Sequence, residues 1–258
     1  MPKSNKLRIL CFGDSLTSGY SRSGLASHPY EEKLVKELKV ARPELEVETT
    51  EDGRPGDLTG FFVSRCHNHF GPKQPKYDWT IILGGTNDLA RQYSPETIFD
   101  NLKRCWDLAL SHGSKVLALT VPEVGVRSRT DEMRDKLNDM IRKAQGGNIY
   151  VHDHAAAVPY WSLSQEERDK YWDDHVHLTA DGYDLMGKMI AARLVDILLG
   201  EEIEANNKNS SDERPSGSSR SRPGVKAFRG DGTVFEEETG DSSKLRQGYV
   251  VVRRTDLD

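Results

Sequence analysis

The sequence predicts an α/β fold, a three-layer α/β/α sandwich around a central parallel sheet, followed by a C-terminal extension of low order. Two observations lead to this prediction. Short strand-like runs alternate with segments of helical periodicity up to about residue 200, and the composition then becomes polar and rich in serine. Alternation of this kind gives parallel strands joined by right-handed crossovers. Ligands bind outside the carboxyl ends of such strands, so the candidate functional residues directly follow the strand-like runs.

The strand-like runs are short, and each is either continuously apolar or alternating. They cover residues 7–12, 45–50, 79–83, 116–121 and 149–151. Gly84 and Gly85 follow the third run, and Pro122 follows the fourth. Short apolar runs that are bounded by turn residues are typical of buried strands.

The segments between these runs carry apolar residues at the i, i+3 and i+4 spacing of a helix that faces a core. They cover residues 30–40, 95–113, 130–144 and 179–199. Pro43 follows the first helical segment and ends it. Ser94 and Pro95 open the second segment with an N-cap residue and a first-turn proline.

The composition divides the chain after about residue 200. We expect residues 201–224 to form a disordered linker, because residues 206–224 hold six serines, two prolines and no large apolar side chain. Residues 225–258 form a short C-terminal extension in which residues 225–235 have the pattern of a hairpin. This extension is too short for an independent domain. It docks on the main domain, pairs with a protein partner by strand addition, or stays loose.

The overall composition excludes several classes of function. A net charge of −5 leaves no broad basic field for nucleic acid. No apolar run is long enough to span a membrane, and the first one is too short for a signal peptide. Three scattered cysteines predict free thiols in a reducing compartment, so we expect a cytoplasmic protein. No phosphate-binding loop or nucleotide fingerprint is present, and no cofactor is expected.

Three residues form a candidate catalytic set. Ser15 follows the first strand-like run, and Asp174 and His177 precede the last helical segment. A serine hydroxyl is a poor nucleophile unless a base takes its proton, and an imidazole does so when a carboxylate holds its tautomer. Asp174 stands three residues before His177, so it can reach one ring nitrogen and leave the other facing Ser15. This set predicts a serine hydrolase of the esterase type that acts on a small-molecule ester.

The segment around Ser15 reads Gly-Asp-Ser-Leu-Thr-Ser-Gly and is not the Gly-x-Ser-x-Gly elbow of α/β-hydrolases, because Thr17 stands at the second glycine position. It resembles the first sequence block of the SGNH (GDSL) hydrolase superfamily. Gly56 fits the second block, residues 85–88 (Gly-Thr-Asn-Asp) fit the third, and Asp174-x-x-His177 fits the fifth. The resemblance extends over residues 7–200, which we expect to form the catalytic domain.

The resemblance implies an SGNH/flavodoxin-like sandwich and an acyl-enzyme mechanism without metal or cofactor. Ser15 would be the nucleophile, His177 the base and Asp174 its orienting carboxylate. The backbone N–H groups of Ser15 and Gly56 and the side-chain amide of Asn87 would form the oxyanion hole. Small carboxylic esters are the expected substrates. The alternatives are a lysophospholipase or acyl-thioesterase, a carbohydrate deacetylase of the same fold, and a catalytically inactive binding protein.

Other residues are weaker candidates. Aromatic or cationic side chains near the site are candidates for substrate binding, with packing as their competing role: Arg54, Tyr160, Trp161 and Trp172. We expect Asp14 to cap or support the turn that carries Ser15.

Six of the eight histidines occur in His-x-His pairs, a spacing that can bind zinc when both side chains share a face. The pairs are His67/His69, His152/His154 and His175/His177. We favour surface histidines over a zinc-dependent deacylase.

Overall fold

The computed structural model describes residues 5–212 of the 258-residue chain. The chain divides into two units, residues 1–209 and residues 210–258, and the fold described below is that of the first unit. Its strands are β1 (Lys6–Gly13), β2 (Tyr20–Ser21), β3 (Ala26–Ser27), β4 (Glu46–Gly53), β5 (Trp79–Leu83), β6 (Lys115–Leu119) and β7 (Ile149–His152). Its helices are α1 (Tyr30–Ala41), α2 (Thr59–Cys66), α3 (Thr86–Ala90), α4 (Pro95–Ser111), α5 (Thr130–Lys143), α6 (His154–Ala157), α7 (Gln165–Tyr171) and α8 (Ala180–Asp212).

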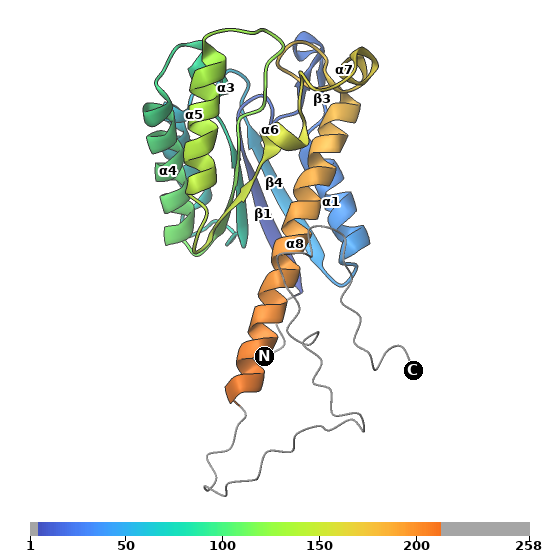
Figure 1. The fold of residues 1–258 in the computed structure, drawn as a ribbon. Helices are drawn as coiled ribbons and strands as arrows, with labels where there is room; N and C mark the ends of the chain where they lie inside the picture. The colour runs from blue at the N-terminus through green and yellow to red at the C-terminus, as the bar shows by residue number, and fades with distance from the viewer. Residues whose placement is uncertain (1–4, 213–258) are drawn as a thin grey trace, which may run out of the picture. The chain divides into compact units, whose positions relative to one another are not determined.

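Five strands form one parallel sheet in the order β4-β1-β5-β6-β7. Helices α1 and α8 cover one face of the sheet, and α4 and α5 cover the other (Figure 1). The predicted three-layer α/β/α sandwich is therefore confirmed. No helix within residues 5–212 is both long and apolar enough to cross a membrane.

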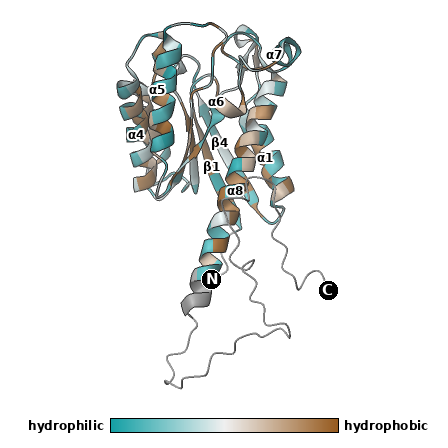
Figure 2. Ribbon diagram, in the orientation of Figure 1, coloured by the Kyte–Doolittle hydropathy of each residue, from teal (hydrophilic) through white to brown (hydrophobic). Residues whose placement is uncertain are grey.

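Strands β1, β5 and β6 contribute side chains to both of the hydrophobic clusters, because successive side chains point to opposite faces of the sheet. In β1, Ile9 and Cys11 belong to the cluster under α1 and α8, while Leu10 and Phe12 belong to the cluster under α2, α4 and α5. The helices turn their hydrophilic residues outward, as the teal outer face of α5 shows in Figure 2.

The strand order places a topological switch point between β1 and β5. The chain leaves β1 for β4 on one side and later returns to β5 on the other side. The connections at the carboxyl ends of β1 and β5 therefore diverge and open a crevice, which is where open α/β sheets bind their ligands. Ser15 and Asn87 follow these two strands directly.

The last helix differs from its predicted extent. The sequence predicts a helix that ends near Leu199 and a linker that begins at residue 201, whereas α8 continues to Asp212. Glu201 pairs with Lys115 and accepts a hydrogen bond from Tyr150 at 2.7 Å, and Glu202 accepts one from Arg42 at 2.6 Å. These contacts hold the first of the added turns, and α8 runs through the first residues of the segment that the sequence predicts as a linker. The rest of the linker and the predicted hairpin lie outside the described residues.

Candidate active site

Ser15, His177 and Asp174 form a continuous hydrogen-bonded chain. Ser15 Oγ lies 3.0 Å from His177 Nε2, and His177 Nδ1 lies 2.9 Å from Asp174 Oδ2. Burial opposes ionisation of Asp174, but hydrogen bonds from His177 and from two backbone N–H groups outweigh it and hold the pKa of the carboxyl below its usual value. An ionised Asp174 keeps the proton on Nδ1 and leaves Nε2 free to accept the Ser15 proton.

A tight turn at the end of β1 holds the serine. The backbone N–H groups of Thr17 and Ser18 both donate to the carbonyl oxygen of Asp14 at 3.2 Å. The Asp14 side chain is fully buried, and its Oδ1 accepts the Leu16 N–H at 3.0 Å. Asp14 therefore supports the turn from within, and Ser15 is left at the mouth of the crevice.

The histidine is held by the segment that joins α7 to α8. The backbone N–H of Asp173 donates to the carbonyl oxygen of His177 at 2.9 Å. The Tyr20 ring packs against the imidazole with a centroid distance of 4.6 Å, and the Tyr183 hydroxyl donates to the Tyr20 carbonyl oxygen at 2.7 Å. A hairpin residue and a residue of α8 thus fix the ring beside Ser15.

Gly56 and Asn87 are connected through Asp57, the residue that follows Gly56. Gly56 has a φ of +77°, a conformation that favours glycine, and a Cβ added there would have no heavy atom within 4 Å. The Asn87 amide nitrogen donates to the carbonyl oxygen of Asp57 at 3.0 Å. A side-chain amide has two N–H donors, so one remains for a ligand.

Arg65 connects the walls of the site, a role that the sequence does not indicate. Its guanidinium donates to the carbonyl oxygens of Gly13 at 2.6 Å and Asp52 at 2.7 Å, and to the Asp57 carboxylate at 3.0 Å. Gly13 precedes the Ser15 turn, and Asp57 follows Gly56. One buried arginine therefore ties the ends of β1 and β4 to the Gly56 loop. Its position on α2, shortly after that loop, is the only signal the sequence offers.

A mainly apolar cavity of about 290 Å³ opens beside His177 and Asn87. Its walls come from α3, from the segment after β6, from the first turns of α5 and from the His177 segment. The lining residues are Thr86, Asn87, Leu89, Ala90, Val121, Pro122, Val124, Val126, Thr130, Arg134, Val176 and His177. Because its members come from four separate segments, no single stretch of sequence marks it.

None of the four predicted substrate-binding residues lines this cavity. The Trp172 indole donates to the Pro159 carbonyl oxygen at 3.2 Å, and its ring packs against Tyr160 with a centroid distance of 5.1 Å. The Trp161 indole donates to the Val124 carbonyl oxygen at 3.0 Å. Arg54 turns outward, with 61% of its side chain exposed. The three aromatic residues therefore pack the segments beside the site.

The histidine pairs do not fit one description. His152 and His154 are buried, so the expectation of surface residues is wrong for this pair, because β7 and α6 turn both rings into the protein. Burial lowers the pKa of His152 to about 4 and that of His154 to about 3. His69 pairs with Asp52 at 2.7 Å, and His175 lies 3.0 Å from the Tyr160 hydroxyl. Within the described residues, no three His, Cys, Asp or Glu side chains gather as a metal site.

One family model matches most of the chain. The model of the GDSL-like Lipase/Acylhydrolase family matches residues 11–185. No curated protein matches the chain.

Several solved structures share the fold. The lipase/acylhydrolase from Enterococcus faecalis is 24% identical with a TM-score of 0.56, and the match covers 74% of this chain and 96% of that one. The acetylxylan esterase Axe2 from Geobacillus stearothermophilus is 20% identical with a TM-score of 0.57, covering 71% and 92%. A lipolytic G-D-S-L protein from Veillonella parvula is 21% identical with a TM-score of 0.57, covering 71% and 95%. The chain belongs to the GDSL-like lipase/acylhydrolase family and is an ester-hydrolysing enzyme.

Proposed function

We propose that the protein is a serine esterase that hydrolyses small carboxylic esters through an acyl-enzyme, with Ser15 as nucleophile, His177 as base and Asp174 as its orienting carboxylate. The observation that carries the proposal is the unbroken chain from Ser15 Oγ to His177 Nε2 at 3.0 Å and from His177 Nδ1 to Asp174 at 2.9 Å. This is the geometry that activates a serine hydroxyl.

The reaction has two halves. Ser15 Oγ attacks the acyl carbonyl carbon while His177 Nε2 takes the hydroxyl proton. The tetrahedral intermediate collapses, the C–O bond to the alcohol breaks, and His177 returns the proton to the departing alcohol. Water then attacks the acyl-enzyme with its proton passing to His177, and collapse of the second intermediate releases the carboxylic acid and restores Ser15.

The developing oxyanion would be held by the backbone N–H groups of Ser15 and Gly56 and by the free N–H of the Asn87 amide. The arrangement supports this role because Gly56 presents an open backbone and Asn87 lies beside it through its bond to Asp57. A single donor of this kind stabilises a transition state by about 2.7–4 kcal/mol.

The size of the cavity favours small substrates. Its volume of about 290 Å³ is slightly below the range for small-molecule sites, which begins at about 300 Å³. A long acyl chain, as in a lysophospholipase or acyl-thioesterase, would extend beyond it. Axe2 is named for acetylated xylan, and its likeness to this chain is one of fold. A carbohydrate deacetylase is therefore an alternative, and the experiment must distinguish it from an esterase that acts on small carboxylic esters.

The test is hydrolysis of p-nitrophenyl esters from acetate to palmitate, and of acetylated xylo-oligosaccharides, by wild type and Ser15→Ala. We expect activity on short p-nitrophenyl esters that EDTA does not reduce and that Ser15→Ala abolishes. Ser64→Ala is a matched control, since Ser64 lies on the exposed side of α2 and its hydroxyl donates to the Phe61 carbonyl oxygen at 2.9 Å.

Turnover that survives in Ser15→Ala would disprove the assignment of the nucleophile. A preference for palmitate or for the acetylated sugar would support the corresponding alternative. A wild type that is inert on every ester would support the inactive binding protein.

A further inference from the structure

The cavity beside His177 has one permanently charged residue among the described residues that line it. Most of its wall is aliphatic, from Leu89 on α3 to Val176 beside the histidine. Arg134, on the second turn of α5, is the exception. No carboxylate of the described chain lines the same space. The cavity therefore offers an anion a cationic partner within apolar walls.

Arg134 is buried although its ion pairs do not require burial. Its side chain is 6% exposed, and Nη1 lies 2.9 Å from Asp131 Oδ1. An i,i+3 pair of this kind forms equally well on the outer face of a helix, where the guanidinium stays hydrated. Burial of a charge carries a desolvation cost that such a pair does not offset by itself. The position of Arg134 in the cavity wall therefore calls for a further partner.

The acidic neighbours leave part of the guanidinium unused. Asp131 is shared, because its second oxygen lies 3.8 Å from Arg127 and 3.3 Å from the Ser128 N–H. Asp135 lies 3.5 Å from Arg134 Nη2, and its side chain is 73% exposed, so water screens this pair. Within residues 5–207, the hydrogen bonds of Arg134 come from Nη1 and Nη2, and none comes from Nε.

A second polar group in the same wall also lacks a partner. The hydroxyl oxygen of Thr86, next to Asn87, is buried without a hydrogen-bond partner among the described residues. Buried hydroxyl groups are normally satisfied, by protein, water or ligand. Because this oxygen is closed off from the open cavity, a ligand there would contact Arg134 and not the Thr86 hydroxyl.

Building on the proposed function, we propose that the preferred substrates are esters that carry a carboxylate, and that Arg134 binds this carboxylate in the cavity. Two types of ester carry such a carboxylate. In a half-ester of a dicarboxylic acid the carboxylate belongs to the acyl group, and in an acyl ester of a hydroxy acid it belongs to the alcohol. A guanidinium binds a carboxylate through charge-assisted hydrogen bonds, which are about twice as strong as neutral ones. Arg134 thus determines specificity and takes no part in the chemical steps.

The test compares substrates of matched length with and without the charge. On the acyl side, mono-p-nitrophenyl glutarate is compared with p-nitrophenyl valerate, which has the same number of acyl carbons. On the alcohol side, acetoxyacetate is compared with acetoxyacetamide, and acetate release is followed. The measured quantity is the ratio of kcat/KM for the charged member to that for the neutral member, in wild type and Arg134→Gln.

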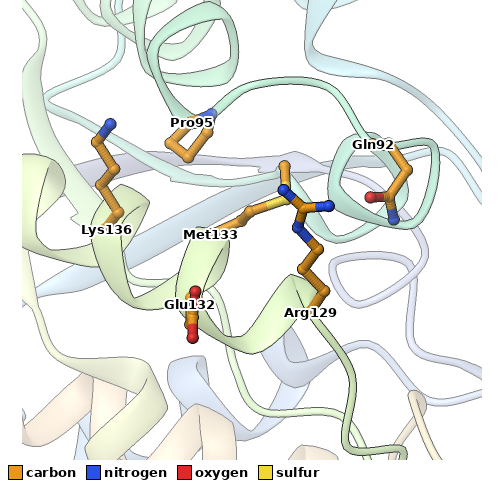
Figure 3. Close-up of a pocket in the computed structure, with 6 residues that line it drawn as sticks. All are labelled: Gln92, Pro95, Arg129, Glu132, Met133 and Lys136. Carbon is orange, nitrogen blue, oxygen red and sulfur yellow. The ribbon is translucent and has the colours of Figure 1, made fainter.

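Arg129→Gln is the matched control. Arg129 lies one residue before α5 and lines a different hollow, with Gln92, Met133 and Lys136 (Figure 3). We expect Arg134→Gln to lower the ratio at least about 10-fold for one substrate pair, which corresponds to one charge-assisted hydrogen bond. Arg129→Gln should leave the ratio unchanged. The pair that responds identifies the side of the ester that bears the carboxylate.

Inhibition of wild type keeps the proposal testable if Arg134→Gln does not fold. Glutarate should inhibit hydrolysis of p-nitrophenyl acetate more strongly than glutaramide, and equal inhibition would overturn the proposal. So would equal ratios in wild type and Arg134→Gln, or a wild type that prefers the neutral members of both pairs. In those cases hydrolysis of p-nitrophenyl acetate continues and the proposed function stands. A wild type that hydrolyses no ester would disprove both.

Discussion

Asp14 and Asp174 flank the Ser15–His177 pair, and their environments act on them in opposite directions. Burial raises the pKa of Asp14 to about 7, so at neutral pH this carboxyl is partly protonated. Hydrogen bonds from His177 and from backbone N–H groups outweigh the burial of Asp174 and lower its pKa. Only Asp174 is both fully ionised and in contact with the imidazole, so it alone fits the role of orienting the base.

Replacing Asp174 therefore tests the arrangement at the scale of a single residue. Asp174→Asn keeps the shape but removes the charge that holds the proton on Nδ1, so we expect kcat to fall by about 10³–10⁴-fold with the protein still folded. Asp173→Asn is the control, because the Asp173 carboxylate accepts the Arg22 N–H at 2.5 Å and does not touch the imidazole. Steady-state kinetics of both variants measure the difference. Equal losses would contradict the assignment.

At the scale of elements, the strands and long helices were predictable because their patterns are local. β5 has the predicted bounds at residues 79–83, and α4 begins at Pro95 as the Ser94 cap indicates. The short elements were not predictable. Helix α7 covers only Gln165–Tyr171 and has no buried residue, so its sequence lacks the apolar periodicity that would predict a helix. Its capping box of Ser164 and Glu167 is the signal that the sequence does contain.

The candidate site likewise has a part that the sequence predicts and a part that it does not. Ser15, Asp174 and His177 carry patterns that the sequence displays, and the structure brings them within hydrogen-bonding distance. The cavity was not predictable, because Arg134 and Val121 meet His177 only through the tertiary fold. Aromatic residues near the site in sequence, such as Trp172, were poor guides to it because packing accounts for their contacts.

Arg65 is the contact between elements whose removal should affect the site most. Arg65→Lys retains the charge but cannot donate at once to Gly13, Asp52 and Asp57. We expect a lower Tm and a decrease in kcat that exceeds the change in KM, since the Ser15 turn and the Gly56 loop lose their common anchor. Arg104→Lys, on the exposed side of α4, is the control. A lower Tm with unchanged kcat would show that Arg65 is structural only.

At the scale of the whole molecule, two buried histidines should make stability depend on pH. The folded protein lowers the pKa of His152 to about 4 and of His154 to about 3, whereas an unfolded histidine titrates near 6.5. Between these values the unfolded chain binds more protons, so the free energy of unfolding decreases as the pH falls below about 6.5. Asp14 acts in the opposite sense, because its raised pKa makes the folded state bind the extra proton from about pH 4 to 7.

A double variant separates these effects. Each buried histidine contributes a slope of up to about 1.4 kcal/mol per pH unit, so His152→Leu/His154→Leu should remove this contribution between pH 4 and 6.5 and leave the opposite contribution of Asp14. Urea unfolding at several pH values measures the slope, with the exposed His67→Leu as control. An unchanged slope in the double variant would mean that the two rings do not stay neutral in the folded protein.

The extent of α8 decides where the catalytic unit ends. Residues 201 and 202 hold the helix against β6, β7 and the end of α1 through Lys115, Tyr150 and Arg42. A chain that ends at residue 212 keeps all three contacts, whereas a chain that ends at residue 200 loses them and leaves the partly buried Lys115 ammonium without its carboxylate. We therefore expect the chain that ends at residue 212 to match the full-length kcat/KM on p-nitrophenyl acetate within about twofold. The chain that ends at residue 200 should unfold at a lower temperature, by an amount equivalent to about 1–3 kcal/mol. If instead both truncations lost activity equally, residues 213–258 would be part of the catalytic unit, and the division of the chain near residue 210 would not describe how it folds.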